Sequence, residues 1–292
     1  MRGDAAASHY ARAGLEEDVL AVIRSLSGEG HTPGVEDLHA VDAFHLMGRH
    51  AAAALAAMLG DIRGSEVLDA GSGPGGTARY LASTFGCVVT GIDVTPQFVS
   101  LARRLSELVS MGDQTTFVEG SVLRLPFEAS RFDIVWMEHV QVNIEQKEEC
   151  LGEIRRVLRP GGRFVFHEVF CPEACDVLYP VPWADEASVS FLVDGKTFRA
   201  LLERTGFRIH TWNDVTAEAL RWGERVLRRI SEKRFPRLGL HLLMGESTGP
   251  KLETLLRNLH EGRLEVIQGI CEGEKQADAH PLTDRVESPT VR

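Results

Sequence analysis

The stretch VLDAGSGPGGTARYLA, residues 67–82, places a short apolar run, a glycine-rich loop and the start of a helical pattern in immediate succession. Glycines in this loop let the backbone turn sharply and let a ligand approach without a Cβ in its way. In doubly wound α/β proteins such a loop follows the first strand, at the carboxyl edge of the sheet, where ligands bind. The stretch therefore predicts an α/β fold with a ligand site at this loop.

Strand and helix patterns alternate through the middle of the chain. Apolar runs bounded by glycine or charged residues are typical of buried parallel strands, and apolar stripes with a helical period at residues 98–108 and 150–158 lie between them. This alternation predicts a doubly wound sheet with right-handed crossovers. The predicted strands are residues 66–70, 88–93, 115–118, 132–137, 163–169, 207–212 and 263–270.

The rest of the chain is expected to surround this core. Residues 1–60 are interpreted as an N-terminal helical extension or lid, with an amphipathic helix over residues 15–26 and a second helical stretch at about residues 49–59. Residues 61–271 are interpreted as the core domain. Residues 215–262 are expected to form a helical insertion whose two amphipathic helices close over a ligand. The polar tail, residues 272–292, is expected to be disordered.

Composition restricts the partners. The chain has 292 residues, of which 43% are hydrophobic and 25% charged, so it can bury a sizeable core and still present a polar surface. Its formal net charge of -10 argues against a nucleic acid or an anionic membrane as partner, because phosphate binding needs a concentrated positive surface. A small-molecule partner is therefore expected, and the oligomeric state stays open.

The cysteines and the apolar runs bear on the cellular location. The first ten residues lack the apolar stretch of a signal peptide, and no later run approaches the roughly 18 apolar residues of a membrane span. The five cysteines are odd in number and scattered, which favours reduced thiols and a cytoplasmic protein. Cys171 and Cys175 lack a second pair or histidines at ligand spacing, so no metal site is predicted.

The identity of the loop's ligand depends on a carboxylate. Gly71, Gly73 and Gly76 also satisfy the dinucleotide pattern G-x-G-x-x-G, so the loop alone does not exclude an NAD-dependent oxidoreductase. Asp69 lies two residues before the first glycine, where it would repel a pyrophosphate but attract a cation. S-adenosylmethionine carries a sulfonium and an ammonium but no phosphate, and Asp93 after the second strand suits its ribose hydroxyls.

Four segments extend this argument to a family. VLDAGSGPGG, TGIDVTP, GSVLRLPFEASRFDIVWMEHV and LRPGGRFVF resemble, in order and spacing, the motifs of class I S-adenosylmethionine-dependent methyltransferases over about residues 40–215. Within that class the chain is similar to the group of ubiquinone/menaquinone-biosynthesis and sarcosine/dimethylglycine methyltransferases. The resemblance implies a seven-stranded Rossmann-like sheet whose last strand runs antiparallel between the fifth and sixth. It also implies methyl transfer to an oxygen, nitrogen or carbon of a small molecule, with S-adenosylhomocysteine as product; a cyclase or binding protein of the same fold is the alternative.

The resemblance also assigns cofactor residues. It implies the methionine moiety near the glycine loop, the ribose near Asp93 and the adenine beside Ser121, where the family usually has an acidic residue one position after the glycine. His45 in FHLMG resembles an F-H-x-x-G element that folds over the cofactor, although a surface linker would also explain it. The complete predicted set is His45, Asp69, Gly71, Ser72, Gly73, Gly75, Asp93, Val94, Ser121, Val122 and Glu138.

Polar residues after the fourth and fifth strands are candidates for the acceptor side. The predicted catalytic residues are His139, Asn143, His167 and Glu168, and His139 would act as a general base that titrates near neutral pH. Ordinary polar roles in the core or loops are the alternative, and His167 and Glu168 point to opposite faces of a strand.

Aromatic and basic residues offer further acceptor contacts. Trp183 and Trp212 would supply apolar or cation–π walls, or simply pack. The arginine-rich segment at residues 221–237 is interpreted as a solvated helix face, with capture of an anionic acceptor as the alternative.

Overall fold

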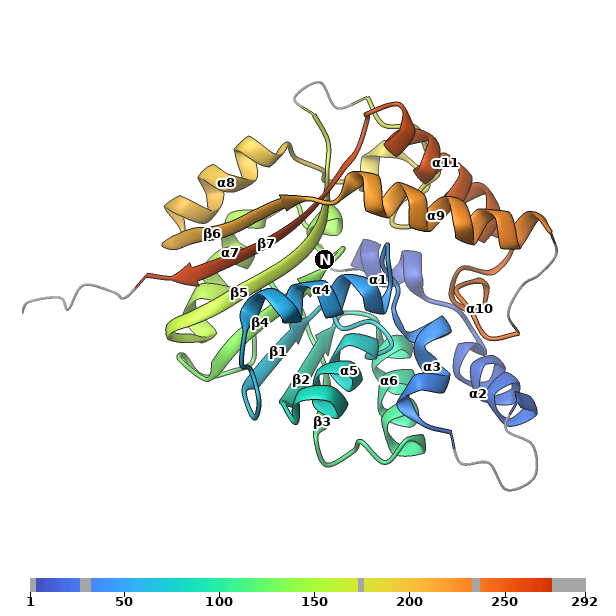
Figure 1. Ribbon diagram of the computed structural model, residues 1–292, viewed down its shortest axis with the longest axis horizontal. Helices are drawn as coiled ribbons and strands as arrows, with labels where there is room; N and C mark the ends of the chain where they lie inside the picture. Colours follow the sequence, from blue (N-terminus) through green and yellow to red (C-terminus); the bar gives the residue numbers. More distant parts are fainter. Residues whose placement is uncertain (1–3, 27–32, 173–175, 233–236, 275–292) are drawn as a thin grey trace, which may run out of the picture.

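The computed structural model describes residues 4–26, 33–172, 176–232 and 237–274. Seven strands form one twisted sheet in the order β3-β2-β1-β4-β5-β7-β6 (Figure 1). β7 runs antiparallel between β5 and β6, and the other neighbours are parallel, which confirms the predicted methyltransferase-type sheet. The strands are β1 (Glu66–Ala70), β2 (Val88–Asp93), β3 (Thr115–Glu119), β4 (Phe132–Glu138), β5 (Leu158–Phe170), β6 (Phe207–Asp214) and β7 (Glu265–Gly273).

Helices cover both faces of the sheet (Figure 1). On one face, apolar residues of α4 (Arg49–Leu59), α5 (Gly76–Phe85) and α6 (Pro96–Leu108) form a core with inward residues of β1, β2 and β4. On the other face, α7 (Lys147–Val157) and α8 (Gly195–Arg204) do the same. Each helix buries one apolar stripe, as the sequence periodicity predicts.

The N-terminal extension contains more helices than the periodicity predicts. α2 (Leu15–Leu26) and α4 were expected from their apolar stripes, whereas α1 (Asp4–Tyr10) and α3 (Val35–Asp42) were not. The two unexpected helices have seven and eight residues, which is too short for a clear apolar period. Apolar residues of α2 and α3 pack with those of α6, so these two helices of the extension cover α6.

The insertion and the tail also differ from expectation. The insertion forms three helices, α9 (Thr216–Ser231), α10 (His241–Met244) and α11 (Thr248–His260), rather than two. The predicted disordered tail begins too early, because Glu272 and Gly273 belong to β7 and pair with β5 and β6. Residues 275–292 of that prediction lie outside the described residues.

One expectation about the cysteines is wrong. Cys171 is disulfide-bonded, whereas Cys87, Cys150 and Cys271 are free and buried. The expectation of reduced thiols rested on spacing along the chain, which does not report distance in space. Within the described ranges, no group of three potential metal ligands lies together, and no helix is long and apolar enough to cross a membrane.

Candidate cofactor and acceptor site

One cavity of about 330 Å³ lies at the carboxyl ends of β1, β2 and β4. This is the edge where parallel α/β sheets bind ligands. The N-terminal extension and the segment after β5 complete its walls. Of the predicted site residues, the cavity is lined by His45, Asp69, Gly71, Ser72, Gly73, Asp93, Val94, Ser121, Val122, Glu138, His139 and Asn143, but not by Gly75, His167 or Glu168.

The glycine loop is held tightly between β2 and the loop after β4. The backbone N–H groups of Gly71 and Ser72 both donate to the carbonyl of Ile92, at 2.8 and 3.0 Å. Gly71 has a φ of +79°, and a Cβ at this position would lie 2.3 Å from a methyl carbon of Val140. A side chain therefore does not fit there without moving the loop.

Gly75 serves the fold rather than the cavity, which corrects its assignment as a cofactor contact. It is the N-cap of α5 in the left-handed conformation, with a φ of +84°. A Cβ on Gly75 would lie 2.6 Å from the Phe117 ring. Its glycine is thus required by helix entry and by packing against β3.

Three carboxyl groups line the cavity close to the glycine loop. Asp69 has a carboxyl oxygen, Oδ2, with no hydrogen-bond partner, and Glu138 has one such oxygen, Oε1. The other oxygen of Glu138 accepts from the Thr77 hydroxyl at 2.5 Å. Burial, followed by the nearby Glu138 and Asp93 carboxylates, raises the pKa of Asp69 well above its ordinary value. A bound cation would relieve this repulsion.

Asp93, the predicted ribose ligand, also forms hydrogen bonds with the backbone of two loops. Its two oxygens accept from the backbone N–H groups of Gly73 and Thr95, each at 2.8 Å. Burial raises its pKa, and these hydrogen bonds oppose the rise. These contacts hold the glycine loop against the end of β2.

These groups fit S-adenosylmethionine. The unpartnered oxygens of Asp69, Glu138 and Ser72 are buried acceptors in a cavity that a cationic ligand would satisfy. Beside the position that the family resemblance assigns to the adenine, the Ser121 hydroxyl oxygen accepts from the Leu123 backbone N–H at 3.2 Å. Its own proton remains available for a ligand.

Three histidine rings cluster beside the carboxylates. The ring of His139 stacks on that of His167, with centroids 5.0 Å apart, and His45 lies 6.1 and 5.8 Å from the two. His45 also lies 3.4 Å from Glu138 across the cavity wall. His45 therefore lines the site, as the cofactor-side interpretation predicts, and is not part of a surface linker.

His139 directs an unpartnered nitrogen into a buried environment. Its Nε2 has no hydrogen-bond partner, and its backbone adopts a φ of +56°, which is uncommon for a residue other than glycine. Burial, then the neighbouring His167 and His45, lower the pKa of His139 well below 6.5. Its burial thus favours the neutral imidazole and argues against the expected titration near neutral pH.

His167 and Glu168 lie behind the cavity wall, which corrects their direct catalytic assignment. The fully buried His167 contacts the Leu46 carbonyl through Nε2 at 3.0 Å. On the opposite face of β5, Glu168 accepts from the backbone N–H groups of Val140 and Gln141 at 2.8 and 3.3 Å. The Glu168 side chain thus holds the loop after β4, whereas the His167 side chain contacts the segment before α4, and neither lines the cavity.

A buried lysine that the sequence analysis missed supports the same loop. The Lys147 ammonium donates to the carbonyls of Gln141 and Ile144, at 2.9 and 2.6 Å, and to that of Phe191. Burial raises the pKa of Glu168 to about 8 and lowers that of Lys147 to about 8. Nothing in the local pattern around Lys147 distinguishes it from a surface lysine.

The N-terminal helix contributes a second missed residue. The Tyr10 hydroxyl donates to the Asn143 side-chain oxygen at 2.9 Å, and the Asn143 amide donates to the Trp183 carbonyl at 3.0 Å. Tyr10 also packs against the rings of Phe44 and Phe98, with centroids 5.8 Å away in each case. α1, the loop after β4 and the segment around Trp183 are therefore joined over the cavity.

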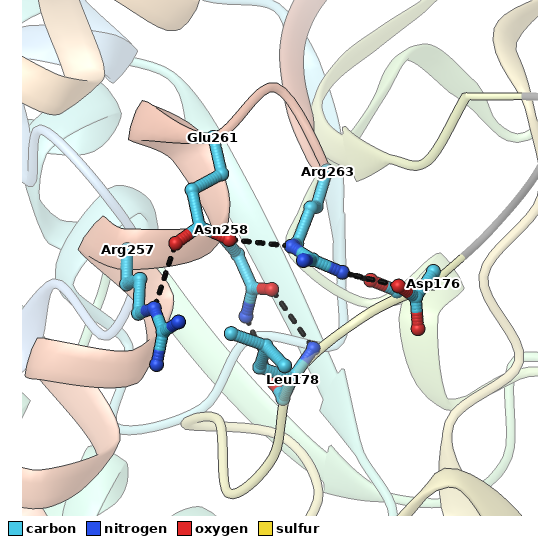
Figure 2. Close-up of polar contacts among 6 residues, drawn as sticks. All are labelled: Asp176, Leu178, Arg257, Asn258, Glu261 and Arg263. Carbon is cyan, nitrogen blue, oxygen red and sulfur yellow. Dashed lines mark hydrogen bonds and ion pairs between the residues drawn. The ribbon is translucent and has the colours of Figure 1, made fainter.

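None of the described residues of the helical insertion, 215–232 and 237–262, lines this cavity. Figure 2 shows polar contacts between the C-terminal end of α11 and the chain at Leu178. Five residues further along, Trp183 lines the cavity. The buried Asn258 side chain exchanges two hydrogen bonds of 2.8 Å with the Leu178 backbone, and Arg263 pairs with Asp176. The insertion thus supports a wall instead of closing over the ligand as expected.

Two other predicted acceptor contacts lie outside the cavity. Trp212 packs against Phe170, and the Arg199 guanidinium lies 4.1 Å from its ring centroid. Arg221 pairs with Glu218 on the same helix, at 3.0 Å. The described arginines of residues 221–237 do not line the cavity, which agrees with a solvated helix face.

The free energy of unfolding should depend on pH because His167 is buried in the folded chain. Burial lowers its pKa to about 3, whereas an unfolded histidine titrates near 6.5. The unfolded chain therefore binds this proton first, and stability is lost as pH falls from about 6.5 towards about 3, by about 1.4 kcal/mol per pH unit. We expect His167→Gln to flatten this slope in urea unfolding between pH 7.5 and 4.5. The exposed His260→Gln is the control, and parallel curves for wild type and His167→Gln would contradict the assignment.

Comparison with known proteins finds similarity to methyltransferases. A methyltransferase domain model matches residues 68–166. The sarcosine/dimethylglycine N-methyltransferase of Halorhodospira halochloris is 28% identical over 169 residues, which are 58% of this chain and 61% of that protein. Other curated relatives are named as O-methyltransferases and sterol 24-C-methyltransferases. The chain spans from 30% to 70% of the length of the curated relatives that it matches.

Solved structures share the fold. A putative sarcosine dimethylglycine methyltransferase from Galdieria sulphuraria superimposes with a TM-score of 0.64 at 20% identity, over 77% of this chain and 86% of that one. The [4+2]-cyclase SpnF superimposes with a TM-score of 0.65 at 18% identity, over 90% and 94%. The sheet order, the glycine loop lined with carboxylates and the methyltransferase domain match over residues 68–166 make the chain similar to class I S-adenosylmethionine-dependent methyltransferases.

Proposed function

We propose that the protein transfers a methyl group from S-adenosylmethionine to a small-molecule acceptor. The observation that carries this proposal is that Asp69, Asp93 and Glu138 line the same cavity as His139, whose Nε2 has no partner. The first three suit a cationic cofactor, and the fourth suits removal of a proton. The cytoplasmic location and a role in secondary metabolism are also proposals, supported by the composition and by the kinds of relatives.

The chain's own residues have limited chemistry to perform. When bound, the cofactor supplies a methyl group activated on a sulfonium, so no covalent intermediate with the protein is needed. The acceptor's lone pair forms the new bond to the methyl carbon as the carbon–sulfur bond breaks, and an acceptor proton passes to Nε2 of His139. Alignment in a closed cavity contributes about 7 to 11 kcal/mol to such reactions.

Two alternatives are separated by binding and product analysis. The oxidoreductase alternative has no support from the methyltransferase domain match and relatives, and it conflicts with the carboxylate at Asp69. Calorimetry should show binding of S-adenosylmethionine and S-adenosylhomocysteine but not of NAD. A cyclase of the same fold would bind both sulfur compounds without forming S-adenosylhomocysteine in proportion to product, so their stoichiometry decides between the two.

Asp69→Asn tests the electrostatic basis of the proposal. The change nearly preserves shape but removes the carboxylate that would ionise and pair with a cationic cofactor, so we expect cofactor affinity to fall by about 1.5 to 3 kcal/mol, roughly 10- to 150-fold. Asp61→Asn is the matched control, because Asp61 is exposed and pairs with Arg63 outside the cavity lining. Equal affinity of the Asp69→Asn variant and wild type in calorimetry would remove Asp69 from the cofactor site.

A further inference from the structure

The cavity wall has an unbalanced charge. Among the described residues, its lining contains the carboxylates of Asp69, Asp93, Glu138 and Glu145, but no lysine or arginine. Anionic ligands in proteins are usually held by such cations, especially by the forked guanidinium of arginine. S-adenosylmethionine itself brings one net positive charge, which the carboxylates near the glycine loop already exceed.

The buried cations closest to this site are committed elsewhere. Arg79 is fully buried under the glycine loop and donates to the carbonyls of Pro74 and Ala102. Lys147 is surrounded by three backbone carbonyls of the loop after β4 and the 191 segment. Lys251 of α11 pairs with Asp185 at 3.0 Å, and its ammonium lies 3.5 Å from Nε2 of His9, which lines the cavity. A carboxylate or phosphate on an acceptor could recruit one of them only by breaking these contacts.

The rest of the wall is aromatic and apolar. Tyr10, Phe44, Trp183, Val189 and Phe191 line the cavity, and they come from α1, the segment before α4 and the segment after β5. Flat aromatic walls bind apolar ring systems through burial and offset stacking. Nε2 of His139 lies in the same lining without a hydrogen-bond partner, so it can meet an acceptor hydroxyl.

On this basis we propose that the acceptor is an uncharged compound with an apolar, aromatic body and a hydroxyl group that His139 deprotonates, and that acceptors carrying a carboxylate or phosphate are rejected. This inference rests on the proposed function and narrows its substrate class. The proposed acceptor differs from sarcosine and dimethylglycine, the compounds for which one relative is named, because both of those compounds carry a carboxylate. Methylation forms the oxygen–carbon bond and breaks the carbon–sulfur bond, while the hydroxyl proton goes to His139.

A pair of probes that differ in one charge tests the inference. In the presence of S-adenosylhomocysteine at pH 7, we expect 2-naphthol to bind at least 10-fold more tightly than 6-hydroxy-2-naphthoic acid in fluorescence titrations. Equal or tighter binding of the acid, or binding of neither probe, overturns the inference and leaves the proposed function intact. Calorimetry on the same sample measures S-adenosylhomocysteine binding, and its absence would overturn the proposed function together with the inference.

A charge added to the wall provides the converse test. Val189 lines the cavity from a short 3-10 turn, so Val189→Arg places a guanidinium beside the acceptor while Val189→Met adds comparable length without charge. We expect Val189→Arg to bind the acid at least 10-fold more tightly than wild type does, and Val189→Met to keep the wild-type preference. If both variants discriminate as wild type does while still binding S-adenosylhomocysteine, the missing cation does not explain selectivity and the inference fails.

Discussion

Replacing His139 with asparagine should reduce kcat by roughly 10²- to 10⁴-fold, the usual contribution of a general base. Asparagine tolerates the left-handed backbone that His139 adopts at φ +56°, so the variant removes the imidazole with little backbone strain. Affinity for S-adenosylhomocysteine should stay within a few-fold of wild type. Because burial lowers the pKa of His139, the wild-type rate should show no step near pH 6.5.

Two neighbouring variants make this result specific. His167→Gln changes a contact with the segment before α4, and Glu168→Gln changes a contact with the loop after β4. Neither residue lines the cavity, so we expect smaller losses of kcat than at His139. Steady-state kinetics with one acceptor that wild type methylates, together with circular dichroism to check folding, compares all three. Full activity in His139→Asn would eliminate the imidazole base and leave catalysis by alignment alone. A large loss confined to Glu168→Gln would indicate that Glu168 of β5, and not His139, accepts the proton.

The second large effect is expected at the glycine loop. Gly71→Ala places a methyl group 2.3 Å from a carbon of Val140, in a backbone conformation with φ +79°. Overpacking costs about 1 to 3 kcal/mol, and the left-handed backbone costs about 1 to 2 kcal/mol more for alanine. We expect urea unfolding to show the sum of these losses, and cofactor affinity to fall at least 10-fold because the loop must move.

Gly73→Ala separates the cost of the left-handed backbone from the cost of the steric contact with Val140. Gly73 also has a positive φ, of +50°, but a Cβ there meets nothing within 4 Å. Its stability loss should therefore be limited to the backbone term, about 1 to 2 kcal/mol. Adding Val140→Ala to Gly71→Ala removes the two methyl carbons at 2.3 and 2.9 Å and should restore part of the stability. Equal losses in the two glycine variants, without rescue, would show that the contact with Val140 is unimportant.

Local sequence patterns were sufficient for the sheet and for one side of the site. The seven strands and the glycine loop followed from apolar runs and from glycines, which report backbone geometry over a few residues. Asp69 and Asp93 were located because each ends or nearly ends a parallel strand, and those strand ends meet at one edge. Their roles as cofactor ligands stay predictions until the variants are measured.

Only the tertiary structure decided the acceptor side. Tyr10 meets Asn143 across 133 residues of chain, and no local pattern marks a tyrosine on a seven-residue helix as part of a cavity. The insertion looked like a lid from its amphipathic helices, but amphipathicity reports that a helix packs and not where it packs. Likewise, strand alternation predicted His167 and Glu168 on opposite faces of β5. Only the folded chain shows that the segment at Leu46 contacts the first, that the loop after β4 contacts the second, and that neither lines the cavity. The sequence by itself thus determined the fold and the cofactor edge, because both depend on contacts repeated along each element. The acceptor wall depended on contacts between distant segments, which only the folded chain brings together.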